Sequence, residues 1–256
     1  MKIINLNKTL GIIGAGQLGK MIGLAAANLG IKVCFYDPDP NAPAKSISNF
    51  FYNEKYTNKK KISEFSKKCD FVTYEFENIP VNSLKVLEKK NKVYPNINAL
   101  KISQDRYLEK SFIRNLGIKT ANFQKIINHS SIEKFLKKNQ GKGIIKTRRL
   151  GYDGKGQYKA RLENFKKIKL DLKSNSYIIE KFIPFNKEIS VIAVREQNGL
   201  VKTFEPSENY HKEGILRKTT FPVSLPENYI IKAKKIAKSI IKKLRIVGIL
   251  AVEMFV

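Results

Sequence analysis

The first third of the chain alternates short apolar runs with amphipathic helical patterns. Residues 10–13 form an apolar run, a helical pattern follows, and residues 31–36 form a second apolar run. A third run, at residues 69–74, comes after another short helical pattern. Strands that alternate with helices in this way predict a parallel sheet with helices packed on it. We therefore expect a Rossmann-like α/β domain, with a further helix at residues 81–90 and a last short strand at residues 93–95.

From residue 97 the alternation gives way to longer extended segments. Residues 99–116 are predicted to form one helix that contains Arg106 and is ended by Gly117. Two shorter helical patterns lie at residues 130–138 and 229–244. The extended patterns fall at residues 118–127, 143–146, 157–160, 177–182, 188–194, 200–205, 215–222 and 247–256. Extended segments that follow one another through short turns predict antiparallel sheets, so this region is expected to be of the α+β type.

The turn after the first apolar run reads Gly14-Ala15-Gly16-Gln17-Leu18-Gly19. A helix that begins at such a turn can hold a phosphate on its unpaired N–H groups. Asp37, at the end of the second apolar run, occupies the position of a ribose-binding acid. Taken alone, this pattern predicts a dinucleotide site. A tight turn with close helix packing and no ligand is the alternative.

The chain is strongly basic, with 49 Lys and Arg against 22 Asp and Glu and a formal net charge of +27. Such a balance is compatible with a polyanionic partner such as nucleic acid. The lysines are dispersed over the polar faces of predicted helices, however, and form no basic stripe with interleaved aromatic residues. We therefore expect no specific nucleic acid partner.

The cysteines and the apolar runs indicate the compartment. Cys34 and Cys69 lie within strand-like apolar runs, so two buried thiols are expected rather than a disulfide or a metal pair. The first residues lack a charged and then apolar signal region with a cleavage site, and no apolar run approaches the length of a membrane span. We expect a globular, cytoplasmic protein with no membrane partner.

A glycine-rich and basic stretch at residues 146–157, KTRRLGYDGKGQ, follows the apolar residues 143–145. Its glycines let the backbone approach a ligand closely, and its cations and exposed N–H groups favour an anion. The spacing differs from the Walker-type loop, which needs Gly, four residues and then Gly-Lys-Ser or Gly-Lys-Thr. The stretch therefore predicts a loop that covers phosphate in another class of nucleotide site.

Several carboxylates follow or lie on predicted strands. Glu75, Glu77 and Asn78 come just past the strand at residues 69–74, at the edge where open parallel sheets bind ligands. Glu77 could instead cap the helix that begins near Pro80.

In the second region, cations and carboxylates suited to a nucleotide recur. Arg106, Lys146 and Lys155 suit a triphosphate, and Glu188 could accept hydrogen bonds from ribose hydroxyls. Glu253 projects from a strand whose sequence indicates burial, where a carboxylate is costly unless it is paired or binds a metal. Each of these side chains also has a plainer interpretation as a surface charge.

Five motifs, taken in chain order, carry a family resemblance. They are the glycine turn, Asp37-Pro38-Asp39-Pro40-Asn41-Ala42-Pro43-Ala44, Thr73-Tyr74-Glu75-Phe76-Glu77-Asn78, Gly151-Tyr152-Asp153-Gly154-Lys155-Gly156-Gln157, and His211 with Gly214-Ile215-Leu216-Arg217. Together they resemble the ATP-grasp family of 5-(carboxyamino)imidazole ribonucleotide synthases, also called ATPase subunits of phosphoribosylaminoimidazole carboxylase. The resemblance covers nearly the whole chain from Leu10. The third and fourth motifs are its specific part.

The resemblance implies an ATP-dependent carbon–nitrogen ligase of purine and IMP biosynthesis. Such an enzyme joins bicarbonate to the amine of 5-aminoimidazole ribonucleotide through carboxyphosphate, with ATP and Mg²⁺ or Mn²⁺ as cofactors. A homodimer is implied as well. Residues 1–98 would form the Rossmann-like, or pre-ATP-grasp, substrate-binding domain. Residues 99–183 would form the linker helix and small lid domain of the ATP-grasp fold, and residues 184–256 its incomplete C-terminal domain.

The resemblance also assigns roles to residues. For ATP it implies Arg106, Lys146, Gly151, Tyr152, Asp153, Gly154, Lys155, Gly156, Gln157, Glu180, Lys181, Phe182, Ile183, Glu188 and His211. For the imidazole ribonucleotide it implies Gly16, Gln17, Leu18, Glu75, Asn78, Tyr152 and Asp153. Lys155, Asp153 and Arg217 are expected to be catalytic, and Glu253 is expected to bind the metal.

Two departures from the family pattern bear on these expectations. Leu150 stands where the family usually has Gly, which reduces flexibility at the start of the loop. The chain also stops at Val256, before a second metal-binding Glu and an Asn that the family carries. A fragment or a truncated product with little activity is therefore expected.

Two competing hypotheses remain at this point. A different ATP-grasp ligase, of the formate-dependent glycinamide ribonucleotide type, is disfavoured by TYEFEN followed by GYDGKGQ. An NAD-binding oxidoreductase is favoured by the glycine turn and Asp37, although no second-domain signature supports it.

Overall fold

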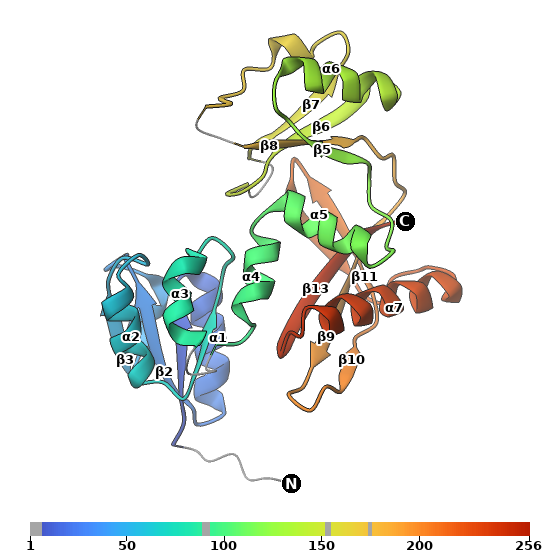
Figure 1. Ribbon diagram of the computed structural model, residues 1–256. Coiled ribbons are helices and arrows are strands. Elements are labelled where there is room, and N and C mark those ends of the chain that lie inside the picture. The colour runs from blue at the N-terminus through green and yellow to red at the C-terminus, as the bar shows by residue number, and fades with distance from the viewer. Residues whose placement is uncertain (1–6, 89–92, 152–154, 174–175) are drawn as a thin grey trace. The chain divides into compact units, whose positions relative to one another are not determined.

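The parallel sheet of the N-terminal part forms from the apolar runs of the sequence (Figure 1). The computed structural model describes residues 7–88, 93–151, 155–173 and 176–256. The sheet has the strand order β3-β2-β1-β4, and all of its pairs are parallel. Its strands are β1 (Thr9–Ile13), β2 (Lys32–Asp37), β3 (Phe50–Asn53) and β4 (Phe71–Tyr74).

Helices cover both faces of this sheet, because neighbouring strand residues point to opposite sides. Ile12 and Phe35 pack in a core with α1 (Gln17–Asn28) and the 3-10 helix η1 (Pro43–Ile47). Their neighbours Ile13 and Cys34 pack in a second core with α2 (Lys59–Lys67) and α3 (Val81–Glu88). The predicted α/β class is confirmed for this part of the chain.

The chain divides into two compact units, residues 1–101 and 102–256. The helix α4 (Ile97–Ser103) crosses this division. In the described part of the chain, no helix combines the length and the apolar composition needed to cross a membrane. The domain bounds expected from the sequence stay predictions.

The second unit contains two antiparallel sheets. The first has the order β5-β8-β6-β7 and is formed by β5 (Phe123–Lys125), β6 (Lys142–Thr147), β7 (Gln157–Arg161) and β8 (Tyr177–Lys181). The helix α6 (His129–Lys138) and the 3-10 helix η2 (Phe165–Lys167) pack on it around a core that includes Phe135, Ile145 and Ile179.

The second antiparallel sheet is built around β9 (Glu188–Arg195). Along one edge, β9 pairs with β13 (Gly248–Phe255), and along the other it pairs with β10 (Val201–Thr203) and β11 (Ser207–Lys212). A final strand, β12 (Ile215–Thr220), pairs with β11. The long helix α7 (Glu227–Lys243) packs on one face of this sheet.

The two faces of the second antiparallel sheet differ in burial. Ile189, Val191 and Ala193 of β9 are almost fully buried, while Ile192 is 41% exposed. Along β13, exposed and partly exposed residues alternate in the same way. Because residues paired across an antiparallel ladder share a face, Glu253, which pairs with Ser190, lies on the same open face as Glu188.

The single helix expected over residues 99–116 is wrong. The structure has α4 and a second helix, α5 (Arg106–Asn115), separated by Gln104 and Asp105. Asp105 has an extended backbone, and its side chain accepts hydrogen bonds from the N–H groups of Tyr107 and Leu108. It is therefore the N-cap of α5, and an Asp in the middle of a helical pattern was the signal for this break.

Two further expectations need correction, and two strands were missed. The short strand at residues 93–95 is only an isolated bridge between Val72 and Val93, since Pro95 has no N–H to donate. Cys69 lies just before β4 rather than within a strand, but both cysteines are buried and free, as expected. The strands β3 and β11 were not predicted.

Candidate active site

The glycine turn before α1 holds a carboxylate of the protein itself. Glu75, the first residue after β4, accepts hydrogen bonds from the backbone N–H groups of Gly16, at 2.8 Å, and Gly19. A Cβ atom added at Gly14, Gly16 or Gly19 would lie no more than 2.8 Å from an atom of the Glu75 side chain. The three glycines therefore form the cradle that lets this carboxylate reach the start of α1.

Asp37 fixes the same turn from β2. Its buried carboxylate accepts hydrogen bonds from the N–H of Ala15 at 2.7 Å, the hydroxyl of Tyr56 at 2.8 Å and the N–H of Asp39 at 2.8 Å. Burial, together with the hydrogen bond to Asp37, raises the pKa of Tyr56, which keeps the hydroxyl a donor. Asp37 is thus engaged within the protein, and its expected position as a ribose-binding acid is not supported.

The remaining residues predicted for the imidazole ribonucleotide lie around this turn. Gln17 and Leu18 open α1, and both side chains are exposed. Asn78 is partly buried in the segment after Glu75. Substrate contacts stay predictions for Gly16, Gln17, Leu18, Glu75 and Asn78. Tyr152 and Asp153 lie outside the described residues.

A second cluster of charges lies in the second unit, between α5 and the sheet that contains β6 and β8. Lys146 Nζ lies 3.0 Å from Glu180 Oε2, and Lys110 Nζ lies 3.4 Å from the same oxygen. Glu180 is 5% exposed, and both lysine side chains are largely buried. Two of the residues predicted to bind ATP, Lys146 and Glu180, are therefore in direct contact.

The cluster of Lys110, Lys146 and Glu180 contains two lysine side chains and only one carboxylate. Burial lowers the pKa of Lys146, and the neighbouring Glu180 opposes this effect. Glu180 Oε1 is buried and has no hydrogen-bond partner among the described residues. A buried acceptor without a donor is costly, so this oxygen is suited to a donor supplied by a ligand.

Lys110 was not predicted from the sequence. It lies four residues after Arg106 on α5, and residues four apart share one face of a helix. That spacing was the signal that could have identified it. Glu109 belongs to the same surroundings, where burial raises the pKa of its carboxyl while Lys110 and Arg106 oppose the change.

The loop after β6 is tied to the start of α5. Arg148 makes a bidentate ion pair with Asp105, with distances of 3.1 Å from Nε to Oδ1 and 2.6 Å from Nη2 to Oδ2. The backbone N–H of Arg106 donates to the carbonyl oxygen of Arg148 at 3.0 Å, and its Nη2 donates to the carbonyl oxygen of Gly151 at 3.2 Å. Arg106 thus contacts the predicted phosphate loop itself.

Glycines of the loop are needed for packing as well as for any ligand. A Cβ atom at Gly151 or Gly156 would lie 2.8 or 2.6 Å from Thr147 Oγ1, and Gly156 also has φ +73°. Leu150 has φ 61°, in the region that favours glycine, while its side chain is 69% exposed. Lys155 and Gln157 are exposed at the far end of the loop, and Tyr152, Asp153 and Gly154 lie outside the described residues.

Glu188 and His211 are in contact on the open face of the second antiparallel sheet, and Glu253 lies on the same face. His211 Nδ1 lies 3.2 Å from Glu188 Oε1. Burial raises the pKa of Glu188, His211 opposes this, and the negative charge of Glu253 adds to it. The expectation that Glu253 projects from a buried strand is wrong, since β13 exposes this side chain on the open face.

The carboxylates on this open face decide whether it is suited to bind a metal ion. Among the described residues, no three His, Cys, Asp or Glu side chains gather as a metal cluster. Glu188 and Glu253 supply two carboxylates that interact electrostatically. Mg²⁺ commonly uses only one or two carboxylates together with phosphate oxygens and water, so the pair fits such an ion.

The other predicted residues fall on strand ends of the second unit. Lys181 ends β8, and Phe182 and Ile183 follow it, with Phe182 40% exposed. Arg217 is the extra residue of a β-bulge in β12, since Lys218 pairs with Tyr210 and Leu216 pairs with His211. Bulges redirect a side chain out of the strand pattern, and the catalytic role expected for Arg217 stays a prediction.

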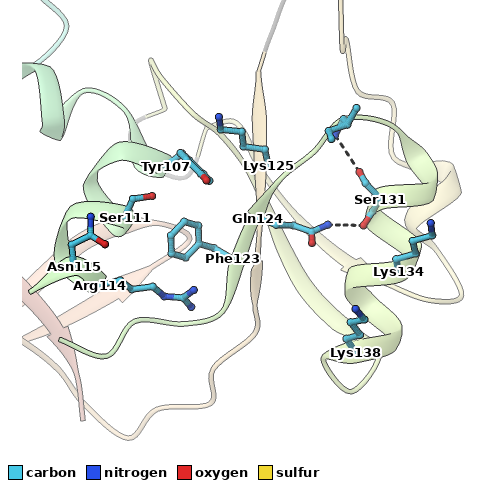
Figure 2. Close-up of a pocket in the computed structure, with 11 residues that line it drawn as sticks. Tyr107, Ser111, Arg114, Asn115, Phe123, Gln124, Lys125, Ser131, Lys134 and Lys138 are labelled. Carbon is cyan, nitrogen blue, oxygen red and sulfur yellow. Dashed lines mark hydrogen bonds between the residues drawn. The ribbon is translucent and has the colours of Figure 1, made fainter. Parts of the chain in front are cut away.

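A groove of about 630 Å³ lies elsewhere, between α5, β5 and α6 (Figure 2). Four cations and no carboxylate line it, namely Arg114, Lys125, Lys134 and Lys138. Arg114 is engaged by Thr120, Ala121 and Asn122 and lies over the ring of Phe123, and Lys125 lies over the ring of Tyr107. Two of the four cations, Arg114 and Lys125, thus already interact with other groups of the protein. None of the predicted site residues lines this groove.

Two family models match the chain. Residues 111–256 match the ATP-grasp domain, and residues 7–104 match the ribonucleotide synthetase preATP-grasp domain. The chain therefore has the two domains of an ATP-grasp ligase, an enzyme that uses ATP. This agrees with the parallel sheet of the first unit and the antiparallel sheets of the second.

Known relatives define the family more closely. N5-carboxyaminoimidazole ribonucleotide synthase of Brucella melitensis is 38% identical over 251 residues, which cover 97% of this chain and 69% of the relative. The ADP complex of an N5-carboxyaminoimidazole ribonucleotide synthetase has a TM-score of 0.91 at 36% identity and covers all of this chain and 68% of that one. The Aspergillus clavatus enzyme in complex with ADP and 5-aminoimidazole ribonucleotide, at 23% identity, shares the fold with a TM-score of 0.86, over 97% of this chain and 66% of that one.

The chain belongs to the family of N5-carboxyaminoimidazole ribonucleotide synthases. The family and the fold class expected from the sequence motifs are confirmed. The individual site roles remain predictions, since the comparisons concern whole chains.

Proposed function

We propose that this protein uses ATP to carboxylate 5-aminoimidazole ribonucleotide with bicarbonate, in purine biosynthesis. Membership of the family over nearly the whole chain supports this most. The contact between Lys146 and Glu180, two residues expected at the nucleotide, agrees with it. The reaction would consist of two transfers that share carboxyphosphate as the intermediate.

In the first transfer, a bicarbonate oxygen attacks the γ-phosphorus of ATP, and ADP leaves. In the second, the amine of the imidazole ribonucleotide attacks the carbon of carboxyphosphate, inorganic phosphate leaves and the amine loses a proton. Charge accumulates on phosphate oxygens in the first transfer, so fixed cations accelerate it by stabilising that charge. Arg106 and Lys146 are the described cations that we propose for this role.

Lys146 is suited to this role because it is already desolvated. A cation in a site of low dielectric interacts more strongly with phosphate than one in water. Burial lowers the pKa of Lys146, and the neighbouring Glu180 opposes this change and so favours the charged ammonium. We propose that Lys110 compensates the charge of Glu180, so that Lys146 can turn to the phosphates.

The adenine of ATP would lie against Glu180 Oε1, Lys181, Phe182 and Ile183. Its ribose would face Glu188 and His211. Glu188 and Glu253 would hold Mg²⁺ or Mn²⁺, which when bound neutralises phosphate charge. The exposed Lys155 and Gln157, with the partly buried Gly156 between them, would approach the phosphates from the loop. Arg217 would face the reacting groups.

In the first unit, the turn and the segment after β4 would bind the ribonucleotide through Gln17, Leu18, Glu75 and Asn78. The homodimer and the cytoplasmic location expected from the sequence are kept as proposals.

The test is the dependence of ADP formation on the second substrate, measured with the protein in excess because little turnover is expected from the sequence. With ATP, Mg²⁺ and bicarbonate present, the protein should release ADP faster when 5-aminoimidazole ribonucleotide is added. Lys146→Met should abolish the increase, whereas Lys142→Met, an exposed residue on the same strand, should leave it. ADP release that ignores the ribonucleotide would contradict the proposal.

A further inference from the structure

The groove between α5, β5 and α6 brings four cations together without a carboxylate to balance them (Figure 2). Arg114 belongs to α5, Lys125 to β5, and Lys134 and Lys138 to α6. In the part of the chain that the structure describes, none of the four makes an ion pair with Asp or Glu. Cations that line one groove repel one another, and a bound anion relieves this repulsion.

The two lysines of α6 that line the groove differ from their neighbour Lys137. Lys137 pairs with Glu133 at 2.7 Å and does not line the groove. Lys134 and Lys138 are four residues apart, so they lie on one face of the helix with Cβ atoms roughly 5–6 Å apart. Both are exposed. This face of α6 therefore offers two adjacent, unpaired charges to a ligand in the groove.

The other two cations are held in place by the protein. Arg114 donates from Nε and Nη2 to oxygen atoms of residues 120–122, and its Nη1 makes no hydrogen bond among the described residues. Its guanidinium lies 4.4 Å from the ring centroid of Phe123, and the ammonium of Lys125 lies 4.4 Å from that of Tyr107. Because these cations are already positioned, less conformational entropy is lost when an anion binds them.

The aromatic rings of the groove favour a ligand recognised through phosphate and not through a base. Tyr107 and Phe123 pack edge to face with ring centroids 5.6 Å apart, and a cation lies over each ring. A base that stacks on an aromatic side chain needs an open ring face. Phosphate oxygens, in contrast, accept charge-assisted hydrogen bonds from guanidinium and ammonium groups. The volume of about 630 Å³ is that of a pocket for a small molecule.

We propose that this groove binds a small molecule with two or more linked phosphate groups, and that it recognises the phosphates alone. The site is separate from the cluster of Lys146 and Glu180, neither of which lines the groove. The helix α5 contributes to both, with Lys110 in the cluster and Arg114 in the groove. The experiment must therefore separate binding in the groove from binding at the cluster.

The probe is inorganic tripolyphosphate, added without Mg²⁺, and the readout is the backbone amide signals of Gln124 and Ser131, which line the groove. These signals should shift and saturate in the wild-type protein. They should do the same in Lys146→Met, because that variant changes only the cluster. The absence of a saturable shift in the wild type would overturn the proposal, and so would its loss in Lys146→Met.

A matched pair of double variants tests the cations themselves. Lys134→Gln combined with Lys138→Gln removes two charges from the groove and should weaken binding at least about tenfold. Lys142→Gln combined with Lys159→Gln removes two charges from exposed residues outside the groove and should leave the affinity close to that of the wild type. Equal weakening by the two double variants would reduce the binding to the overall positive charge of the chain and overturn the proposal.

Two further probes, used at the same salt concentration, define the class of ligand. Uridine triphosphate carries the same three phosphates and should bind the groove about as tightly as tripolyphosphate, whereas an affinity at least about tenfold higher would show that a base is recognised too and contradict the proposal. A single-stranded oligothymidylate should bind more weakly than tripolyphosphate. Tighter binding would assign the groove to nucleic acid instead.

The inference does not rest on the proposed function. Its readout requires neither ATP nor the imidazole ribonucleotide, so either proposal can fail while the other stands.

Discussion

Asp105 joins the start of α5 to the loop after β6, and its removal should destabilise the second unit measurably. Its side chain is 3% exposed and caps α5 by accepting the N–H groups of Tyr107 and Leu108. The same carboxylate holds Arg148. Asp105→Ala removes both interactions, whereas Asp105→Asn keeps a residue that caps helices well and removes the charge.

The expected size follows from these two interactions. An N-cap contributes about 1 kcal/mol, and hydrogen bonds to a charged partner contribute about 1.5–3 kcal/mol. The lower part of that range applies because the Arg148 side chain remains 22% exposed and can be solvated. We therefore expect Asp105→Ala to cost about 3 kcal/mol and Asp105→Asn about 2 kcal/mol of the free energy of unfolding.

Urea unfolding followed by circular dichroism measures this loss. With a slope of about 1–3 kcal/mol per molar urea, a loss of about 3 kcal/mol lowers the midpoint by about 1–3 M. Only the transition of the second unit should move, since the chain has two compact units. Glu163→Ala, which removes an exposed ion pair with Arg161, is the control and should change the midpoint little.

The pH dependence gives the same experiment a second readout. Burial acts to raise the pKa of Asp105, but Arg148 and the capped N–H groups outweigh it, and the net pKa is lowered. A group whose pKa is lowered on folding stabilises the fold above its unfolded pKa and loses this contribution as the pH falls through the folded value. The advantage of wild type over Asp105→Asn should therefore vanish in acid. An Asp105→Ala midpoint that moves no more than that of Glu163→Ala would refute the reasoning.

Three other predictions concern single residues. Leu150 has a left-handed backbone, which β-branched residues adopt poorly, so Leu150→Val should lower the free energy of unfolding by roughly 1 kcal/mol, whereas Leu150→Gly should not lower it. Thermal unfolding measures this, and an unchanged melting temperature in the valine variant would contradict the prediction. Lys110→Met should weaken ADP binding by about tenfold in calorimetry, with Lys110→Arg close to wild type, and equal affinities would remove Lys110 from the site. Because burial raises the pKa of Glu109, the folded state holds its proton to higher pH than the unfolded state, so stability should fall as the pH rises above about 4.5. Glu109→Gln should flatten this part of the profile of melting temperature against pH, and an unchanged slope would contradict it.

The sequence predicted the elements whose hydrophobic pattern is strong. The continuous apolar run at residues 33–36 is typical of a strand buried on both faces, and it lies in β2, where every residue after Lys32 is buried. The strand β11, Ser207–Lys212, was missed because its residues are almost all polar and show no alternation. It forms because β9 and β12 supply its hydrogen-bond partners, which no local pattern reveals.

The candidate site was predicted in parts for a similar reason. Lys146 and Glu180 were chosen individually, and their contact depends on the pairing of β6 with β8. The contact of Glu75 with Gly16 and Gly19 depends in the same way on the pairing of β1 with β4. Spacing along the chain shows which groups are available, but only the sheet register shows which of them meet.

The most direct test of the central claim is to follow the carbon of bicarbonate. With the protein in excess over 5-aminoimidazole ribonucleotide, and with ATP, Mg²⁺ and ¹³C-labelled bicarbonate, carbon NMR should show a carbamate signal that grows as ADP forms. When the ribonucleotide is left out, or when Lys146→Met replaces the wild type, the carbamate signal should be absent and ADP should form no faster than its background rate. ADP formation at the wild-type rate without any carbamate signal would contradict the account.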